Sequence, residues 1–324
     1  MKRFLRVLGY SLLSMGVVVV SAAVLFAYFI YSPAPELPRL SGTLAKGSIE
    51  VAGWKRTYLT YLPQGLPKGA PLVLVMHGSG QNGTQIRIET GYGFERLADQ
   101  HGFAVAYPDS SSFDWNDCSK VGDFSVNGHL VDDVGFLGAL ADKLISDIGV
   151  DRSRVFATGV SSGGFMSIRL ALEAPSQFRA IAAVSANVPA PENFKCTPAA
   201  QGTSVMIMNG TKDPLVPFAG GESNLLGLFY KGGNVRSSYE SGQYFADFDH
   251  IASSPATNQP SATDGVEQFQ WRNDSKVEVE LVAIRGGGHG LPQPYYRRAR
   301  LLGPSPMNPN GPAMIWDFFA RQQR

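Results

Sequence analysis

The sequence predicts an α/β protein, with a mostly parallel central sheet flanked by helices, preceded by one N-terminal membrane-spanning helix. Short apolar runs rich in Val, Leu and Ile, typical of strands buried on both faces, alternate along the chain with segments of helical periodicity. Strands that alternate with helices form right-handed βαβ units, which build a parallel sheet. All these strands belong to one succession, so we expect a single domain over residues 48–324.

The first 32 residues predict the membrane helix. Lys2, Arg3 and Arg6 precede an uncharged run that begins at Val7. A helix over Leu8–Tyr31 spans roughly 36 Å, and the hydrocarbon core of a bilayer is about 30 Å thick. Because a secretory signal has a shorter apolar region, of about 7–15 residues, we favour an uncleaved anchor over a cleaved signal. The basic residues should stay in the cytoplasm, so the rest of the chain is expected outside it.

After this helix the elements follow in order. Residues 33–47 are rich in Pro, Gly and Ser and predict a linker, and Ser48–Leu62 is a β-like stretch with a turn at Gly53. Further strands are expected at Pro71–Met76, Phe103–Tyr107, Arg154–Thr158, Ala180–Val184, Val205–Met208 and Lys276–Ile284. Helices are expected at Tyr92–Gln100, Val131–Ile148, Ser162–Glu173 and Ala313–Arg321.

Two stretches fit this alternation poorly. Phe218–Ser261 is rich in Gly, Ser and Tyr, and Leu291–Pro312 is rich in Pro. Ser237 and Glu240 have the spacing of a capping box, so a helix is expected to start there. The remainder of both stretches predicts loops at the rim of a functional site.

Composition excludes several classes of function. The chain has 28 basic and 27 acidic side chains and a net charge of +1, with no basic block beyond the N-terminus, so a nucleic-acid partner has no electrostatic support. No paired His or Cys stands at metal-ligand spacing, and we expect neither a metal nor another cofactor.

The segment Gly159-Val160-Ser161-Ser162-Gly163 predicts a nucleophile. It follows a predicted strand and opens a predicted helix, which is the context of the sharp turn that exposes a catalytic serine in α/β-hydrolases. Small residues on either side of Ser161 allow so tight a turn. The alternative is an ordinary glycine-rich turn without catalytic function.

A second glycine-rich loop, His77 to Gly83, follows the strand Pro71–Met76. In α/β-hydrolases the loop after an early strand supplies one backbone amide to the oxyanion hole, and the residue after the nucleophile supplies the other. We therefore expect the amides of Ser79 and Ser162 to serve as donors. His77 is expected to be structural.

Two further polar residues follow strands. Asp213 comes after Val205–Met208, and His289 stands among glycines after Lys276–Ile284. Serine, acid and histidine then occur in the chain order of α/β-hydrolases, and the imidazole would take the serine proton while the carboxylate orients it. The rivals for the acid are Asp247 and Asp249, in the poorly patterned stretch Phe218–Ser261, and Asp264, just after it.

The two cysteines, Cys118 and Cys196, lie in polar loop sequence. An exported location permits a disulfide, which we favour over two buried free thiols.

The motifs taken together resemble the polyhydroxybutyrate depolymerase and feruloyl esterase group of secreted carboxylesterases with the α/β-hydrolase fold. The matching pieces run from about Gly47 to Phe319 and include His77 to Gln81, Tyr107-Pro108-Asp109, Trp115-Asn116, Asp132 to Phe136, Gly159 to Gly164, Gly210 to Asp213, Gly286 to His289 and Ile315 to Phe319. The resemblance implies the triad Ser161, Asp213 and His289, and it supports the disulfide because relatives carry cysteines at both places.

The resemblance implies hydrolysis of a carboxylic ester, linked to a polysaccharide or a polyester, through an acyl-enzyme on Ser161. Acyl transfer by the same triad is the alternative, and a non-catalytic surface module is opposed by the intact triad. Gly290-Leu291-Pro292 stands where relatives usually have Thr-Trp-Pro, so an aromatic wall of the pocket is missing. Trp115 is a candidate for the substrate pocket, with a buried core residue as the alternative.

Overall fold

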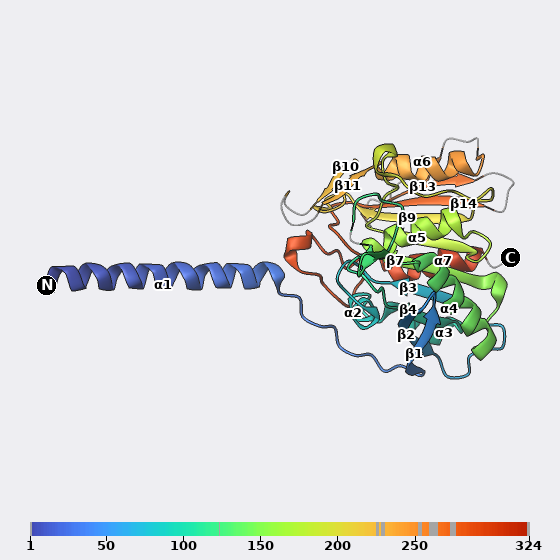
Figure 1. Cartoon of the computed structure of the whole chain (residues 1–324), viewed down its shortest axis with the longest axis horizontal. Helices are drawn as coiled ribbons and strands as arrows, with labels where there is room; N and C mark the ends of the chain where they lie inside the picture. Colours follow the sequence, from blue (N-terminus) through green and yellow to red (C-terminus); the bar gives the residue numbers. More distant parts are fainter. Residues whose placement is uncertain are drawn as a thin grey trace.

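The computed structural model describes residues 2–122, 124–224, 227, 231–251, 255–258, 265–272 and 277–322. It consists of a long N-terminal helix, α1 (Lys2–Ile30), and an α/β domain from which this helix projects (Figure 1). Within α1, the segment Tyr10–Ile30 is long and apolar enough to cross a membrane, and none of it is buried against the domain. Signal sequences near an N-terminus meet the same criterion of length and hydropathy.

The domain is built on a ten-stranded sheet in the order β1-β2-β4-β3-β7-β8-β9-β14-β13-β12. Its central strands run parallel: β4 (Ala104–Pro108), β3 (Leu72–Met76), β7 (Val155–Val160), β8 (Ala180–Val184), β9 (Ser204–Gly210) and β14 (Glu278–Ile284). Antiparallel strands flank them at both edges: β1 (Thr43–Val51), β2 (Trp54–Leu62), β13 (Val266–Arg272) and β12 (Ala256–Asn258). The sheet is therefore mixed, with the predicted parallel part at its centre.

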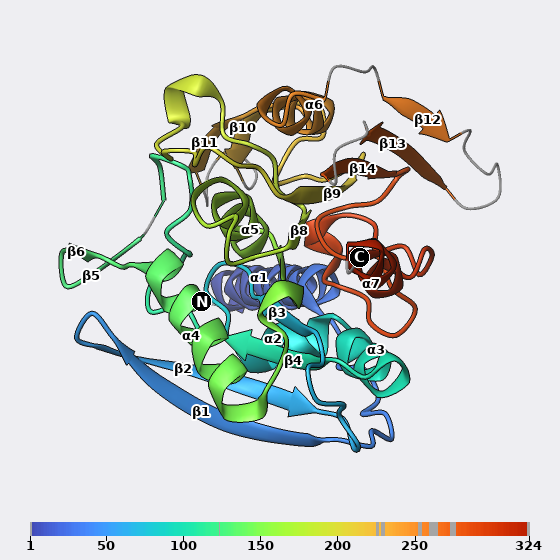
Figure 2. The same ribbon diagram turned by 90° about the vertical axis from the view of Figure 1, so that its right-hand side faces the viewer.

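Helices cover both faces of the sheet (Figure 2). One face packs on α4 (Asp133–Ile148), α5 (Ser162–Glu173) and α6 (Ser238–Phe248), and the other on α2 (Gly83–Glu89), α3 (Gly93–His101) and α7 (Gly311–Arg321). Strand β3 shows how one strand serves both layers, because Leu72, Leu74 and Met76 enter the first cluster while Val73 and Val75 enter the second. This is why the run is apolar without alternation.

The remaining elements are short. They comprise the hairpin β5 (Ser125–Val126) and β6 (His129–Leu130), the hairpin β10 (Gly221–Asn224) and β11 (Lys231–Val235), and the 3-10 turns η1 (Arg152–Arg154), η2 (Pro191–Asn193) and η3 (Arg300–Leu302).

Each predicted strand and helix is present, with ends shifted by a few residues. The predicted capping box at Ser237 is confirmed: its hydroxyl accepts the amide of Glu240, whose carboxylate accepts the amide of Ser237. For the last predicted strand, the starting residue Lys276 lies outside the described residues.

The predicted linker over residues 33–47 is too long, because Thr43–Gly47 belongs to β1 and pairs with Tyr58–Leu62. Gly47 suggested a flexible linker, but it lies within β1, where the ring of Tyr58 packs against it. A Cβ at this position would lie 2.3 Å from that ring, so a larger residue would collide with it. Helix α2, β10 to β13 and the β5–β6 hairpin were not predicted. Strand β13 lies near the sheet edge, and its first five side chains are all half-buried, so it lacks the alternation of buried and exposed residues that marks a strand.

Candidate active site

Ser161 occupies the turn between β7 and α5. Its backbone has φ 59° and ψ −122°, a conformation that L residues rarely adopt and that the surrounding structure must enforce. The turn is held by a hydrogen bond from the Ser161 amide to the carbonyl of Val184, at 2.9 Å. A Cβ on Gly159 would lie 2.4 Å from the backbone of Gly163, and one on Gly163 would lie 2.4 Å from the carbonyl oxygen of Met76. Only glycine fits at either position, as the tight-turn argument predicts.

Asp213 and His289 form a buried pair. The Nδ1 atom of His289 lies 2.8 Å from Oδ2 of Asp213, and the two side chains are 3% and 0% exposed. The other carboxylate oxygen, Oδ1, accepts the amides of Leu215 at 2.8 Å and Val216 at 2.9 Å. A carboxylate only accepts hydrogen bonds, so Nδ1 of His289 carries the proton and Nε2 is left with its lone pair. This is the tautomer that a general base requires.

The pair forms because β9 and β14 are neighbours in the sheet. Ile284 at the end of β14 pairs with Gly210 at the end of β9, and a Cβ on Gly210 would lie 2.3 Å from the carbonyl oxygen of Gly287. Ser161, Asp213 and His289 therefore follow the carboxyl ends of parallel strands at one edge of the sheet, where open α/β sheets bind ligands.

A distant loop holds His289 in place. The amides of Gly288 and His289 donate to the carbonyls of Pro304 and Leu302, both at 2.7 Å, and the guanidinium of Arg298 donates to the carbonyl of His289 at 3.1 Å. On the other side, the amide of Gly290 donates to Oγ of Ser185 at 2.7 Å. The sequence suggested a rim loop over Leu291–Pro312, and the structure shows that part of it supports the histidine.

The predicted oxyanion loop lies directly beside the serine. A Cβ on Gly78 would lie 3.5 Å from Cβ of Ser161. The amides of Gly78 and Gly80 are occupied, since they donate to Oε1 of Gln81 at 3.0 Å and to the carbonyl of Phe113 at 2.7 Å. Among the hydrogen bonds of the described residues, none uses the amide of Ser79. The amide of Ser162 is in the first turn of α5, where no intrahelical acceptor exists.

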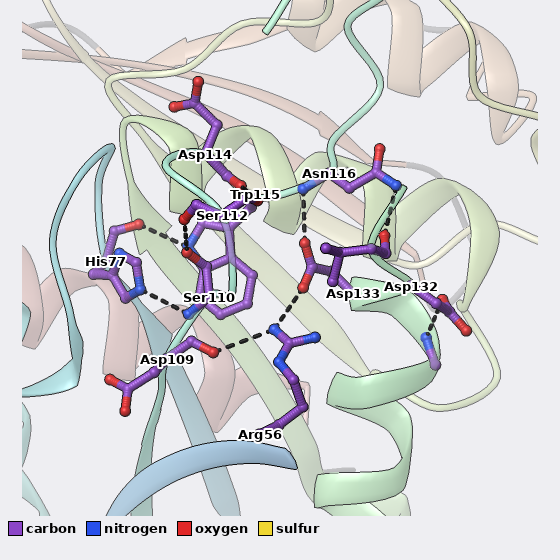
Figure 3. A network of polar contacts seen from close by, with 12 residues as sticks. Arg56, His77, Asp109, Ser110, Ser112, Asp114, Trp115, Asn116, Asp132 and Asp133 are labelled. Atoms are coloured by element: carbon purple, nitrogen blue, oxygen red, sulfur yellow. Dashed lines mark hydrogen bonds and ion pairs between the residues drawn. The ribbon is translucent and has the colours of Figure 1, made fainter. Parts of the chain in front are cut away.

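His77 fixes this loop rather than reacting. Its Nδ1 lies 2.8 Å from the carbonyl of Gly78, while Nε2 accepts the amide of Ser110 at 3.0 Å (Figure 3). These partners match a neutral ring that donates from Nδ1, and burial lowers the pKa of His77 accordingly. The structural role expected for His77 is thus supported.

Trp115 is a core residue, and its assignment to the substrate pocket is wrong. The residue is 0% exposed, its indole N–H donates to the carbonyl of His77 at 2.9 Å, and its amide donates to Oγ of Ser162 at 2.9 Å. Both bonds tie the segment around Trp115 to the predicted oxyanion loop, through His77, and to Ser162, the residue after Ser161. The sequence left a pocket residue and a buried core residue as alternatives for Trp115, and its burial and the acceptor of its indole N–H support the second.

A buried ion pair anchors the same segment, and the sequence did not reveal it. Nη2 of Arg56 lies 2.6 Å from Oδ1 of Asp133, with side chains 2% and 0% exposed, and Oδ2 of Asp133 accepts the amide of Asn116 at 2.8 Å (Figure 3). Arg56 also donates to the carbonyl of Asp109 at 3.2 Å. In the same segment, the hydroxyl of Ser79 donates to the carboxylate of Asp114, the residue before Trp115.

From the sequence, Asp132 and Asp133 indicated only the start of a helix. Asp132 fills that role, since its carboxylate accepts the amide of Gly135.

The predicted disulfide between Cys118 and Cys196 is confirmed, with the two Cα atoms 4.9 Å apart. It ties the loop after Trp115 to the segment that leads into β9, the strand of Asp213. The amide of Lys195 donates to the carbonyl of Cys118 at 2.9 Å and reinforces this link.

The rival acids lie elsewhere. Asp247 is exposed on α6 and accepts the side chain of Gln243 at 2.8 Å. Asp249 lies against Gly202, just before the amino end of β9 and so at the sheet edge opposite the triad. Asp264 lies outside the described residues.

Known esterases resemble this chain in sequence and in fold. Residues 56–217 match the family model described as esterase PHB depolymerase. The chain is 29% identical over 275 residues to the protein described as "putative esterase NocK" of Nocardia uniformis subsp. tsuyamanensis, and the match covers 81% of this chain and 78% of NocK. It is 29% identical over 185 residues to feruloyl esterase C of Emericella nidulans, covering 55% of this chain and 62% of that protein.

Among solved structures, the acetyl xylan esterase from Aspergillus awamori shares the fold, with a TM-score of 0.56 and 18% identity over 76% of this chain and 94% of that one. The matched family segment spans half of the chain and contains the nucleophile turn, the oxyanion loop and Asp213. The protein therefore belongs to the esterase PHB depolymerase family and is a carboxylic ester hydrolase of the α/β-hydrolase type.

Proposed function

We propose that the protein is a membrane-anchored esterase that acts outside the cytoplasm and cleaves carboxylic esters through an acyl-enzyme on Ser161. The hydrogen bond between Asp213 and His289, at the same sheet edge as the strained Ser161, is the observation that carries this proposal. A buried carboxylate held by two backbone amides orients the imidazole before any substrate arrives.

The reaction follows from these groups. Nε2 of His289 takes the proton of Ser161 as Oγ attacks the ester carbonyl, and the amides of Ser79 and Ser162 stabilise the negative charge that develops on its oxygen. The imidazolium then gives its proton to the departing alkoxide, which leaves as the alcohol. Water, activated by the same imidazole, releases the acid and restores Ser161.

The family and the relatives favour feruloyl, acetyl or hydroxyalkanoate esters as substrates. Leu291 stands where relatives usually have Trp, and Trp115 is buried, so neither of these two positions offers an aromatic ring to the substrate. A panel of aryl, acetyl and hydroxybutyrate esters would rank the three classes by kcat/KM.

Export and anchoring are supported by α1 and by the disulfide, which forms in oxidising compartments. The full-length chain should stay with membranes after high-salt and alkaline washing, because a spanning helix is not held electrostatically. Recovery of a soluble form trimmed at its N-terminus would instead show a cleaved signal.

Ser161→Ala tests the nucleophile. We expect a loss of at least about 10⁴-fold in kcat on a soluble aryl ester, with an unchanged melting temperature. Ser153→Ala, at an exposed serine outside the site, is the matched control and should retain activity. Wild-type activity in the Ser161 variant would remove this residue from the mechanism.

A further inference from the structure

A basic cavity lies where the proposed membrane helix meets the loop that supports His289. Its volume is about 580 Å³, and it is lined by Tyr31, Pro33, Arg297, Arg298, Arg300 and Gly303 to Ser305. The first two residues directly follow α1, and the others belong to the segment whose carbonyls hold the backbone of Gly288 and His289.

Several contacts join the end of α1 to this segment. The guanidinium of Arg300 lies 4.2 Å from the ring centroid of Tyr28 and donates to the carbonyl of Tyr28 at 3.1 Å. The hydroxyl of Ser32 donates to the carbonyl of Arg297 at 2.6 Å. The cavity is thus a defined junction between helix and domain.

The depth of the cavity relative to a bilayer follows from the same residues. The apolar stretch ends at Ile30, and Tyr28, Phe29 and Tyr31 are exposed around that end. Aromatic residues at the end of a membrane helix lie at the level of the lipid headgroups. A cavity lined by Tyr31 and Pro33 therefore lies at headgroup depth when α1 spans the membrane.

The charge of the cavity is positive. Arg298 is neutralised, since it forms a partly exposed ion pair with Glu89. Arg297 and Arg300 are exposed, and among the described residues neither forms an ion pair with a carboxylate. Two guanidinium groups without carboxylate partners, in a cavity at the bilayer surface, match the phosphate group of an anionic lipid.

We propose that this cavity binds the phosphate of a lipid headgroup beside the loop that positions His289. The inference rests on the proposed membrane anchor but does not depend on the proposed chemistry at Ser161. A bound phosphate would bridge Arg297 and Arg300 and hold the active-site edge of the domain against the membrane.

The test uses the full-length protein in a nonionic detergent, titrated with dihexanoylphosphatidylglycerol, dihexanoylphosphatidylcholine or inorganic phosphate, with calorimetry as the readout. The phosphatidylglycerol should bind more tightly than the phosphatidylcholine. Arg297→Gln with Arg300→Gln should weaken that binding by at least about 10-fold, since each substitution removes a charge-assisted hydrogen bond to the phosphate, which contributes on the order of tenfold. Competition by inorganic phosphate would show that phosphate from any source is recognised; its absence would show that the lipid is the ligand.

Two further variants make the result specific. Arg39→Gln with Arg152→Gln removes the same charge at exposed positions outside the cavity and should keep wild-type affinity. Arg297→Lys with Arg300→Lys should bind the lipid more tightly than the Gln variant. Equal affinity in wild type and in the Gln variant, or an equal loss in the Arg39 and Arg152 control, would overturn the proposal. Ser161→Ala should bind the lipid like the wild type, so failure of the esterase mechanism is seen separately as missing turnover.

Discussion

Three hydrogen bonds hold the side chain of Asp213, and they predict what an amide would do in its place. Oδ1 accepts the amides of Leu215 and Val216, so an Asn must keep its oxygen there to avoid placing donor against donor. Its NH2 group then takes the position of Oδ2 and points at Nδ1 of His289, 2.8 Å away. Nδ1 has to accept, the proton moves to Nε2, and the imidazole can no longer take the proton of Ser161.

We therefore expect Asp213→Asn to lower kcat by about 10³–10⁴-fold, which corresponds to roughly 4–5.5 kcal/mol in the activation barrier. The volume is conserved and both backbone hydrogen bonds are kept, so the melting temperature should change little. The assay is turnover of a soluble aryl ester at saturating substrate, with thermal unfolding of the same sample.

Asp247→Asn and Asp249→Asn are the matched controls, since both change a carboxylate to an amide away from His289. Both should retain most of the wild-type kcat. The reasoning fails if Asp213→Asn keeps most of its activity, and an accompanying loss in a rival variant would identify the true acid.

Three further outcomes concern stability. Loss of the disulfide by Cys118→Ser should lower the free energy of unfolding by up to about 4.5 kcal/mol, which is the loop-closure figure for the 78-residue separation of Cys118 and Cys196. An unchanged midpoint of urea unfolding would contradict this prediction. Arg56→Met should cost about 3–5 kcal/mol because it leaves the carboxylate of Asp133 buried and unpaired, whereas Arg56→Met with Asp133→Leu should recover much of that loss in urea unfolding. Burial raises the pKa of Asp249 from 3.8 to about 7, so its stabilising contribution is present below about pH 4 and lost as the pH rises through 7. Asp249→Asn, which imitates the protonated acid, should be more stable than wild type at pH 8 but not at pH 4, and equal melting curves at pH 8 would refute this.

The sequence by itself determined the order of strands and helices at the centre of the sheet, the nucleophile turn and the chain order of the candidate triad. These features are local: a buried strand is apolar throughout, a tight turn excludes side chains at Gly159 and Gly163, and a capping box needs only Ser237 and Glu240. The carboxyl ends of parallel strands lie at one edge of the sheet, so the sequence placed Asp213 and His289 at the same edge. That β9 and β14 are neighbours, which brings the two side chains into contact, comes from the structure.

Only the tertiary structure decided which polar residues support the site. Arg56 and Asp133 are 77 residues apart in sequence, and neither carries a local signal of a buried partner. Trp115 is a core residue whose indole N–H donates to the carbonyl of His77, a partner 38 residues away in the sequence. The cavity at Arg297 and Arg300 likewise exists only because a loop near the C-terminus contacts the end of α1. Such contacts depend on the packing of distant segments, which local propensity and periodicity do not encode.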